Sequence, residues 1–196
     1  MKDSQFAAVT YDLFMKTLEP LLIKKWRQRL WQLVKGPRVL EAGVGTGLNI
    51  AYYKPYHQIT AIDINESFLK RARKKVRNGP VQVELITGDV RNLPFPAATF
   101  DSAVTTFLFC QLPDPLPGLK EMKRVLKPNG KLLLLEHVRP NGRLESLISA
   151  LSGPLYRLSG EQIAHDTEAF VKNAGFANVT STALFLNIVK LVQAVK

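Results

Sequence analysis

Apolar runs alternate with amphipathic helical patterns along most of the chain. The apolar runs lack a strict two-residue alternation, which is typical of strands buried on both faces of a parallel sheet. We predict such strands at Arg38–Ala42, Gln58–Asp63, Val81–Ile86, Asp101–Phe107 and Lys131–His137. The predicted helices between them are Leu48–Tyr53, Glu66–Arg77 and Leu116–Leu126. This alternation indicates an α/β protein.

The segment before the first strand predicts helices. Its apolar residues recur at helical spacing through Tyr11–Lys35, and Pro20 suits the first turn of a second helix. The basic residues among them are Lys24, Lys25, Arg27, Arg29 and Lys35. With Trp26 and Trp31, this basic amphipathic stretch can lie on an anionic membrane. Alternatively, it covers the sheet and leaves its basic side in solvent.

The chain after the fourth strand contains a turn signal and then changes its pattern. The turn signal, Lys127–Gly130, ends a helix and leads into the fifth strand. The elements predicted after Pro140 are a helical insertion at Leu144–Leu158, a helix capped by Asp166 or Thr167 and ending at Asn173, and strands at Asn178–Leu186 and Ile188–Val195. Because these last two strands are joined tightly, they predict an antiparallel hairpin.

Length and composition limit the classes of protein. A chain of 196 residues with 46% hydrophobic residues has the size of one domain with a full core. Its single cysteine, Cys110, excludes an intramolecular disulfide framework and argues against a cysteine-based zinc site, so we expect no metal. Neither a signal-peptide pattern nor an apolar run long enough to cross a bilayer is present in the sequence, which predicts a cytoplasmic protein.

The formal net charge of +11 favours anionic partners, such as nucleic acid, anionic lipid surfaces or acidic substrates. The charge run Lys70–Arg77 is more typical of a solvated helix face than of a nucleic-acid groove, because no aromatic residues are interleaved for stacking. We therefore do not expect nucleic acid as a partner.

The most specific pattern follows the first predicted strand. Gly43, Gly45 and Gly47 form G-x-G-x-G, not the G-x-G-x-x-G of dinucleotide-binding loops. Such glycines let a ligand lie against the backbone, and a following helix would direct free N–H groups at it. Asp63 ends the next apolar run, 20 residues after Gly43, where a carboxylate can bind ribose hydroxyls. This predicts a nucleoside ligand; a plain glycine turn beside a solvated aspartate is the alternative.

The segment Arg38–Asn49 resembles motif I of the class I S-adenosylmethionine-dependent methyltransferases, and further matching segments follow in that family's order. The local resemblance is to small bacterial phosphatidylethanolamine N-methyltransferase-like enzymes, and it extends to quinone methyltransferases and membrane-associated thiol methyltransferases. The segments that carry it are Gly45–Asn49, Phe107–Cys110, Pro113–Pro115, Arg124–Pro128 and Leu135–Val138. Many members end the insertion with an Asn-Arg-Asp-Thr-like run, whereas this chain has Ile163–Thr167.

The strand pattern and the resemblance together imply a Rossmann-like, doubly wound, seven-stranded sheet. It would be mostly parallel, with one antiparallel strand in the C-terminal hairpin. The expected parts of this single domain are a helical cap (1–36), a cofactor-binding core (38–137), a helical insertion near the substrate (140–165), and a closing helix with the hairpin (166–196).

The resemblance implies the cofactor S-adenosyl-L-methionine, with S-adenosyl-L-homocysteine as its product. In the family, the acid at the position of Glu41 holds the methionine end, and the Asp at that of Asp89 accepts from the adenine amino group. Asp89 also follows a strand at the edge where open α/β sheets bind ligands, although a turn-stabilising aspartate is the alternative. The expected cofactor-binding residues are Tyr11, Glu41, Gly43, Gly45, Thr46, Gly47, Asn49, Asp63, Ile64, Gly88, Asp89, Val90, Thr106 and Phe107.

Candidate acceptor groups follow the fourth and fifth strands. His137 is the titratable residue best placed to act as a base, and an ordinary pKa of about 6.5 suits proton transfer. A strand-end histidine bonded to the backbone is the alternative. Cys110 is interpreted as a pocket wall rather than a nucleophile, and His57 as a surface residue. The expected substrate-pocket residues are Tyr11, Cys110, His137 and His165; for His165, a capping or surface role is the alternative.

The sequence therefore predicts an S-adenosylmethionine-dependent methyltransferase for a small or lipid-like acceptor, with the amine of phosphatidylethanolamine first. A quinone or a small thiol is the alternative acceptor. An RNA methyltransferase would need an Asn-Pro-Pro-Tyr-like motif after the fourth strand, and Thr106–Phe109 contains none. A non-catalytic nucleoside or lipid-surface binding module is the alternative from another class. We expect a cytoplasmic protein with peripheral contact to anionic membranes.

Overall fold

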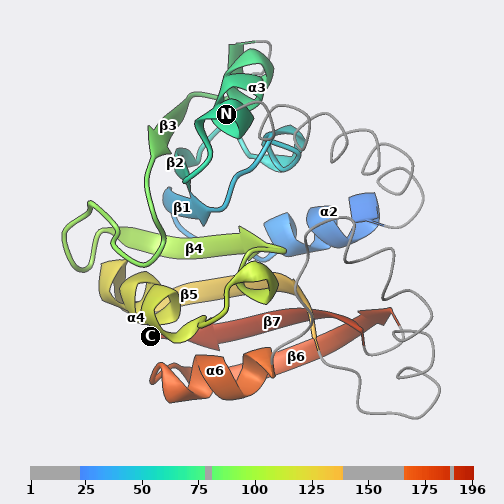
Figure 1. The fold of residues 1–196 in the computed structure, drawn as a ribbon, viewed down its shortest axis with the longest axis vertical. Coiled ribbons are helices and arrows are strands. Elements are labelled where there is room, and N and C mark those ends of the chain that lie inside the picture. Colours follow the sequence, from blue (N-terminus) through green and yellow to red (C-terminus); the bar gives the residue numbers. More distant parts are fainter. Residues whose placement is uncertain (1–22, 78–80, 139–165, 186–187) are drawn as a thin grey trace.

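The computed structural model describes residues 23–77, 81–138, 166–185 and 188–196. This part of the chain forms a seven-stranded sheet with the order β3-β2-β1-β4-β5-β7-β6 (Figure 1). The strands are β1 (Arg38–Ala42), β2 (Gln58–Asp63), β3 (Val83–Thr87), β4 (Phe100–Thr106), β5 (Leu126–His137), β6 (Ala177–Phe185) and β7 (Val189–Val195). The α-helices are α2 (Lys24–Gln32), α3 (Glu66–Arg77), α4 (Leu116–Val125) and α6 (Thr167–Asn173), and the 3₁₀ turns are η2 (Ile50–Tyr52) and η3 (Phe109–Gln111).

The strand directions confirm the predicted topology. Strands β1 to β5 pair in parallel, and β7 runs antiparallel to both β5 and β6. The antiparallel strand therefore lies in the C-terminal hairpin. Because β1 lies between β2 and β4, the order of the strands reverses there, and ligands of open α/β sheets bind at the carboxyl ends of strands at such a point.

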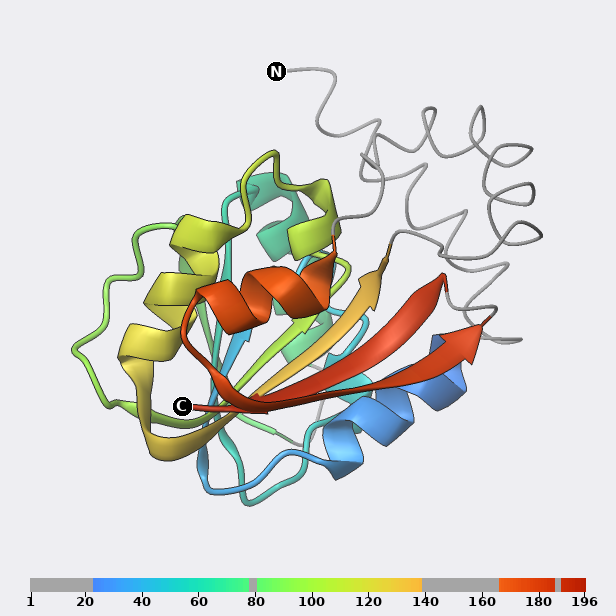
Figure 2. The ribbon, with the colours of Figure 1, turned by 90° about the horizontal axis from the view of Figure 1, so that it is seen from below.

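Helices cover both faces of the sheet, with α2 on one side and α4 and α6 on the other (Figure 2). On the first face, Trp31 of α2 and Leu69 of α3 belong to one core with Val39 of β1. On the opposite face, Leu119 of α4 belongs to a second core with Leu40 of β1. Neighbouring strand residues thus enter different cores, since their side chains point to opposite faces. This burial explains why the strands lack polar alternation.

The helix predicted at Leu48–Tyr53 is wrong, although β1, β2 and α3 have their predicted bounds. Only the 3₁₀ turn Ile50–Tyr52 forms after the glycine loop. Gly45 and Gly47 have φ angles of +55° and +78°, so the chain leaves the helical region, and few residues remain before Pro55. No α-helix N-terminus therefore follows the loop directly, and a ligand there would meet the loop's own N–H groups.

The turn predicted at Lys127–Gly130 is an irregular part of β5. Its pairing with β4 shifts register between Phe100 and Ser102, and Asn129 has a φ of +60°. The turn residues bend the chain as expected. The strand then continues beside the same neighbour, so the structure assigns the whole segment to β5.

The predicted cap of the helix after the insertion is confirmed, whereas two other predictions cannot be compared with the structure. Asp166 caps α6, and its Oδ1 accepts from the N–H of Ala169 at 3.1 Å. The predicted helix start at Pro20 and the predicted insertion at Leu144–Leu158 lie outside the described residues. Among the helices of the described ranges, none is both long and apolar enough to cross a membrane.

Candidate functional site

The glycine loop after β1 exposes its backbone at one position. A Cβ added at Gly45 would meet no atom within 4 Å. A Cβ at Gly43 would approach Leu108 at 2.9 Å, and one at Gly47 would approach Ile50 at 2.5 Å. The expectation that the glycines let a cofactor pass close to the backbone therefore fits Gly45, while the other two glycines permit close packing around the loop.

Asp63 connects the end of β2 to this loop. Its Oδ2 accepts from the N–H of Gly45 at 2.7 Å, and its Oδ1 accepts from the N–H of Asn65 at 2.8 Å. Burial raises the pKa of Asp63. Each carboxylate oxygen carries two lone pairs, so Asp63 can still accept from two further hydroxyls. The carboxylate predicted to bind ribose thus lies beside the open glycine.

The predicted adenine contacts gather around a hollow of about 80 Å³. Asp63 lines it from the end of β2 and Ile64 from the next position, and Gly88–Arg91 line it from the loop after β3. The side chain of Ile64 is 67% exposed, which leaves an apolar surface for a ring to cover. Asp89 accepts from the guanidinium of Arg91 at 2.6 to 3.0 Å, and this interaction lowers the pKa of Asp89. This ion pair at the predicted adenine contact was not predicted from the sequence.

A buried polar network lies on the other side of the loop. Asn49 Nδ2 donates to Glu41 Oε1 at 2.6 Å and to Thr106 Oγ1 at 2.9 Å. Asn49 Oδ1 accepts from Arg27 Nη1 at 2.8 Å, and the hydroxyl of Tyr53 donates to Glu41 Oε2. Burial raises the pKa of Glu41 to about 7, while the hydrogen bonds from Tyr53 and Asn49 act in the opposite direction. Three predicted residues, Glu41, Asn49 and Thr106, are therefore brought together.

Arg27 and Tyr53 are absent from the predicted site. Arg27 precedes Leu30 and Trp31 by three and four residues, so helical spacing already places it on the buried face of α2. The prediction treated Arg27 as one of several basic residues of the segment and therefore did not use its spacing from Leu30 and Trp31. We found no comparable sequence signal for Tyr53.

Phe107 and His137 meet on the acceptor side. Phe107 has a φ of +54°, which is rare for a bulky residue, and its ring stacks on the imidazole of His137 with centroids 4.5 Å apart. Burial lowers the pKa of His137 from its ordinary value of 6.5 to about 4. A neutral ring that holds a proton weakly favours a hydrogen-bonding role over a base. Cys110 is 1% exposed, and Tyr11 and His165 lie outside the described residues.

Glu136 organises the loop that follows β4. Its carboxylate accepts from three successive N–H groups, those of residues 108–110, at 3.1 to 3.2 Å, and from Thr105 Oγ1 at 3.1 Å. The side chain is fully buried, and burial raises its pKa. Glu136 thereby fixes the chain next to Phe107. Glu136 was not predicted as a site residue, although it lies in the segment Leu135–Val138 that carries the family resemblance.

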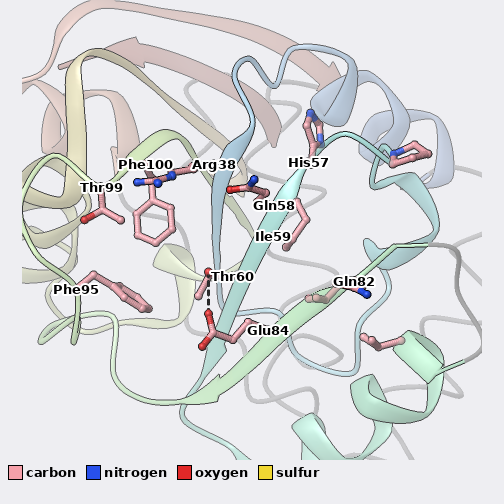
Figure 3. Close-up of a pocket in the computed structure, with 13 residues that line it drawn as sticks. Arg38, His57, Gln58, Ile59, Thr60, Gln82, Glu84, Phe95, Thr99 and Phe100 are labelled. Carbon is pink, nitrogen blue, oxygen red and sulfur yellow. Dashed lines mark hydrogen bonds between the residues drawn. The ribbon is translucent and has the colours of Figure 1, made fainter.

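A larger groove of about 940 Å³ lies at the opposite edge, where the strands begin (Figure 3). Its lining includes Thr60 and Glu84, whose Oγ1 and Oε2 are 3.3 Å apart, and no predicted site residue. His57 also lines this groove, but it is only 4% exposed and contacts the rings of Trp31 and Tyr56, so the prediction of a surface histidine is wrong. Within the described ranges, no group of His, Cys, Asp and Glu is arranged to hold a metal ion.

The sheet topology and the two sides of the glycine loop define a nucleoside-binding protein of the doubly wound class. Residues 40–134 match the family described as a methyltransferase domain. The chain is 40% identical over 122 residues to a phosphatidylethanolamine N-methyltransferase of Cereibacter sphaeroides, and the match spans 60% of each protein. It is 32% identical over 173 residues to a ubiquinone/menaquinone biosynthesis C-methyltransferase of Pseudomonas entomophila, over 83% of this chain and 68% of that protein.

The fold also resembles that of an S-adenosylmethionine-dependent methyltransferase of Thermotoga maritima. The TM-score is 0.75 at 20% sequence identity, and the alignment covers both chains completely. The chain belongs to the S-adenosylmethionine-dependent methyltransferase family.

The residues of the site fit S-adenosylmethionine, the cofactor of this family. Asp63 offers a carboxylate for the ribose hydroxyls, and the open backbone at Gly45 leaves room for a ligand. Glu41 and Asn49 offer polar groups for the amino-acid end. When bound, the cofactor supplies a methyl group that its sulfonium already activates. The protein then has to bind the acceptor, align it and keep water away.

Proposed function

We propose that this protein transfers the methyl group of S-adenosylmethionine to a small or lipid-like acceptor, with the amine of phosphatidylethanolamine as the first candidate. The observation that carries the methyl-donor part is the 2.7 Å hydrogen bond between Asp63 and Gly45, which joins the ribose acid to the open backbone of motif I. The name and 40% identity of the Cereibacter sphaeroides relative support the amine, although the match spans 60% of that protein.

The residues proposed to bind the acceptor, Phe107 and His137, are better suited to align it than to remove a proton from it. An ammonium group must lose its proton before its nitrogen can attack a methyl group. His137 accepts that proton poorly, because burial lowers its pKa to about 4. We therefore propose that the amine enters in its neutral form and donates a hydrogen bond to His137. In-line displacement then depends mainly on alignment beside the stack of Phe107 on His137.

A quinol is the second candidate acceptor. The Pseudomonas entomophila relative, whose name includes ubiquinone and menaquinone, matches 83% of this chain, a longer stretch than the amine-methylating relative does. A quinol offers a ring carbon as the nucleophile, and the flat ring would suit the aromatic surface of Phe107 and His137.

The test is an assay of S-adenosylhomocysteine release with phospholipids, quinols and small thiols, each offered separately. We expect turnover with phosphatidylethanolamine. Preference for a quinol or a thiol would overturn the assignment of the acceptor but keep the methyltransferase. Tight binding of S-adenosylhomocysteine without turnover of any acceptor would support a non-catalytic binding module.

We also propose that the protein works in the cytoplasm with a peripheral contact to anionic membranes. The exposed basic residues of α2 are Lys24, Lys25 and Arg29, whereas Arg27 and Trp31 are 3% and 1% exposed. The apolar face of α2 covers the sheet, so Trp31 is not available to insert into lipid. We therefore expect Lys24, Lys25 and Arg29 to make the electrostatic contacts of α2 with an anionic surface, and Arg27 does not contribute to them.

A further inference from the structure

Phe185, the last residue of β6, keeps much of its aromatic ring in solvent. Among the described residues, the large apolar side chains that stay exposed are those of Tyr56, Ile64 and Phe185, and Phe185 is 41% exposed. Ile64 lines the adenine hollow, and Tyr56 contacts the ring of His57 with centroids 4.6 Å apart. Phe185 lines none of the hollows described above. Its ring instead meets an aromatic ring from α2.

Trp26 of α2 is this neighbour, and we call Trp26 and Phe185 the aromatic patch. Their ring centroids are 6.3 Å apart, with an angle of 42° between the planes. The register of β6 against β7 shifts between Ala183 and Phe185, and an irregularity of this kind redirects a side chain. Leu184 packs against the core on the α2 face, and Phe185 contacts Trp26 on the same face. Figure 2 shows the end of β6 beside α2.

Basic residues of α2 border the aromatic patch. Trp26 is partly buried, whereas Lys25 before it and Arg29 three positions after it are exposed. Residues at this spacing adjoin on a helix surface, and α2 contains no acidic residue. Aromatic rings bordered by cations suit the surface of an anionic bilayer, because the rings enter the headgroup boundary and the cations meet lipid phosphates.

The aromatic patch lies at the same edge of the sheet as the proposed acceptor residues. Phe185 pairs with Val189 of β7, and Val189 pairs with His137 of β5, so one row across three strands joins the patch to His137. Neighbouring strands are about 4.8 Å apart, which places the backbones of Phe185 and His137 about 10 Å apart. Val189 and Phe107 belong to the core on the α2 face. A lipid that contacts the patch is therefore close to the acceptor residues.

We infer that the aromatic patch docks on an anionic lipid surface, with Trp26 and Phe185 in the headgroup boundary and Lys25 and Arg29 at the lipid phosphates. The inference rests on the proposed function and deepens it, because docking turns the carboxyl edge of the sheet towards the bilayer that contains a lipid acceptor. The electrostatic contact of α2 then has an apolar component, which salt does not screen.

The experiment measures the contact of Trp26 with acyl chains. The vesicles contain phosphatidylglycerol and phosphatidylcholine with brominated acyl chains, which quench tryptophan fluorescence on contact, and they contain no phosphatidylethanolamine. Trp31, the other tryptophan of the chain, is 1% exposed, so the quenching reports on Trp26. The test variant is Phe185→Ser. The matched control is Tyr56→Ser, since the exposed ring of Tyr56 also has a cation beside it, Lys54 Nζ at 5.7 Å from the centroid.

We expect the parent to bind these vesicles and its tryptophan fluorescence to be quenched. Phe185→Ser should weaken binding by roughly threefold or more, because the exposed part of the ring no longer leaves water on docking. This difference should persist at high salt. Combining Lys25→Glu with Arg29→Glu should weaken binding mainly at low salt, where charges are not screened. Tyr56→Ser should bind as the parent does.

Vesicle binding without quenching would overturn the inference, because the contact would then depend on charge alone. Vesicle binding that Phe185→Ser leaves unchanged would also overturn it. Self-association of a parent that ignores vesicles, if Phe185→Ser abolishes it, would assign the aromatic patch to a second copy of the chain instead. If Phe185→Ser fails to fold, quenching of the parent decides.

A failure of the proposed function gives a different result. Turnover of phosphatidylethanolamine in detergent micelles needs no bilayer, so it is measured independently of docking. Turnover in micelles by a protein that does not dock on vesicles would overturn the role of the aromatic patch and keep the methyltransferase. Docking with quenching, but without turnover of any acceptor, would support the lipid contact and contradict the proposed function.

Discussion

The two edges of the sheet contain similar polar side chains but arrange them differently. At the carboxyl edge, Glu41, Asp63 and Glu136 each accept two or more hydrogen bonds from neighbouring segments. At the amino edge, Thr60 and Glu84 share one contact of 3.3 Å in a groove of about 940 Å³ (Figure 3). The larger hollow is the less organised one, so converging polar groups identify the ligand site better than volume does.

The topology explains this difference. The loops that leave β1, β2, β4 and β5 all emerge at one edge, and the reversal of strand order separates the loops after β1 and β4. Polar residues from distant parts of the sequence can therefore meet there. The following predictions test whether the two edges differ in function as they differ in structure.

Asp63→Ala should have the largest effect. The change removes the acceptor of the ribose hydroxyls, and hydrogen bonds to a charged acceptor contribute about 1.5–3 kcal/mol each. Calorimetry should show that S-adenosylhomocysteine binds at least about tenfold more weakly. The matched control is Glu84→Ala at the amino edge, which should leave the affinity unchanged. Equal losses in the two variants would remove the distinction between the edges.

Glu41 makes a pH-dependent contribution to stability. Its pKa is about 7 in the folded protein against an ordinary 4.5, so the fold favours the neutral form. The stability that Glu41 contributes is fully present below pH 4.5 and is lost as the pH rises to about 7. The free energy of unfolding should therefore fall by about 3 kcal/mol across this range. Urea unfolding should show the advantage of Glu41→Gln over the parent growing across this range. A difference between Glu41→Gln and the parent that stays flat across this range would contradict the account.

One histidine lies at each edge, His57 at the amino edge and His137 at the carboxyl edge, and burial lowers the pKa of both. His137→Gln should lower turnover by about tenfold, because a hydrogen bond to the acceptor is weakened, and should leave the pH profile unchanged. His57→Gln should leave turnover per folded molecule unchanged. Rates measured against pH decide the matter: a fall of about 10²–10⁴ with loss of a titration step would restore His137 as a base.

Charge reversal on α2 should have the smallest effect per residue. Lys24, Lys25 and Arg29 are exposed, and each basic residue near an anionic surface contributes about 1 kcal/mol. Replacing all three with Glu should reduce co-sedimentation with anionic liposomes, and salt should reduce binding of the parent. The control reverses three exposed charges of α3, at Lys70, Lys74 and Arg77. If the α2 and α3 variants lose liposome binding equally, or if the parent does not bind anionic liposomes at low salt, docking through α2 loses its support.

The hydrophobic pattern and the capping residues of the sequence predicted those elements whose bounds depend on residues close in the chain. The bounds of β1, β2 and α3 follow from hydrophobic periodicity, and Asp166 caps α6 as expected. The short turn after Gly47 was not predicted, because the backbone angles of the glycine loop overcome helical spacing.

The candidate site was predictable mainly where one motif supplies the residues. Gly45 and Asp63 were identified from spacing, and in the structure the N–H of Gly45 donates to Asp63 Oδ2 at 2.7 Å. The contact of Arg27 with Asn49 joins residues 22 positions apart, and no local pattern reveals it. Likewise, the burial that lowers the pKa of His137 depends on tertiary packing, which the sequence pattern does not display.

The central claim is that the carboxyl edge binds S-adenosylmethionine and its product. The most direct measurement is a calorimetric titration of the parent protein with S-adenosylhomocysteine and, separately, with NAD. The account predicts that S-adenosylhomocysteine binds and that NAD binds far more weakly, since the loop lacks the third glycine of dinucleotide sites. Tighter binding of NAD than of S-adenosylhomocysteine would contradict it.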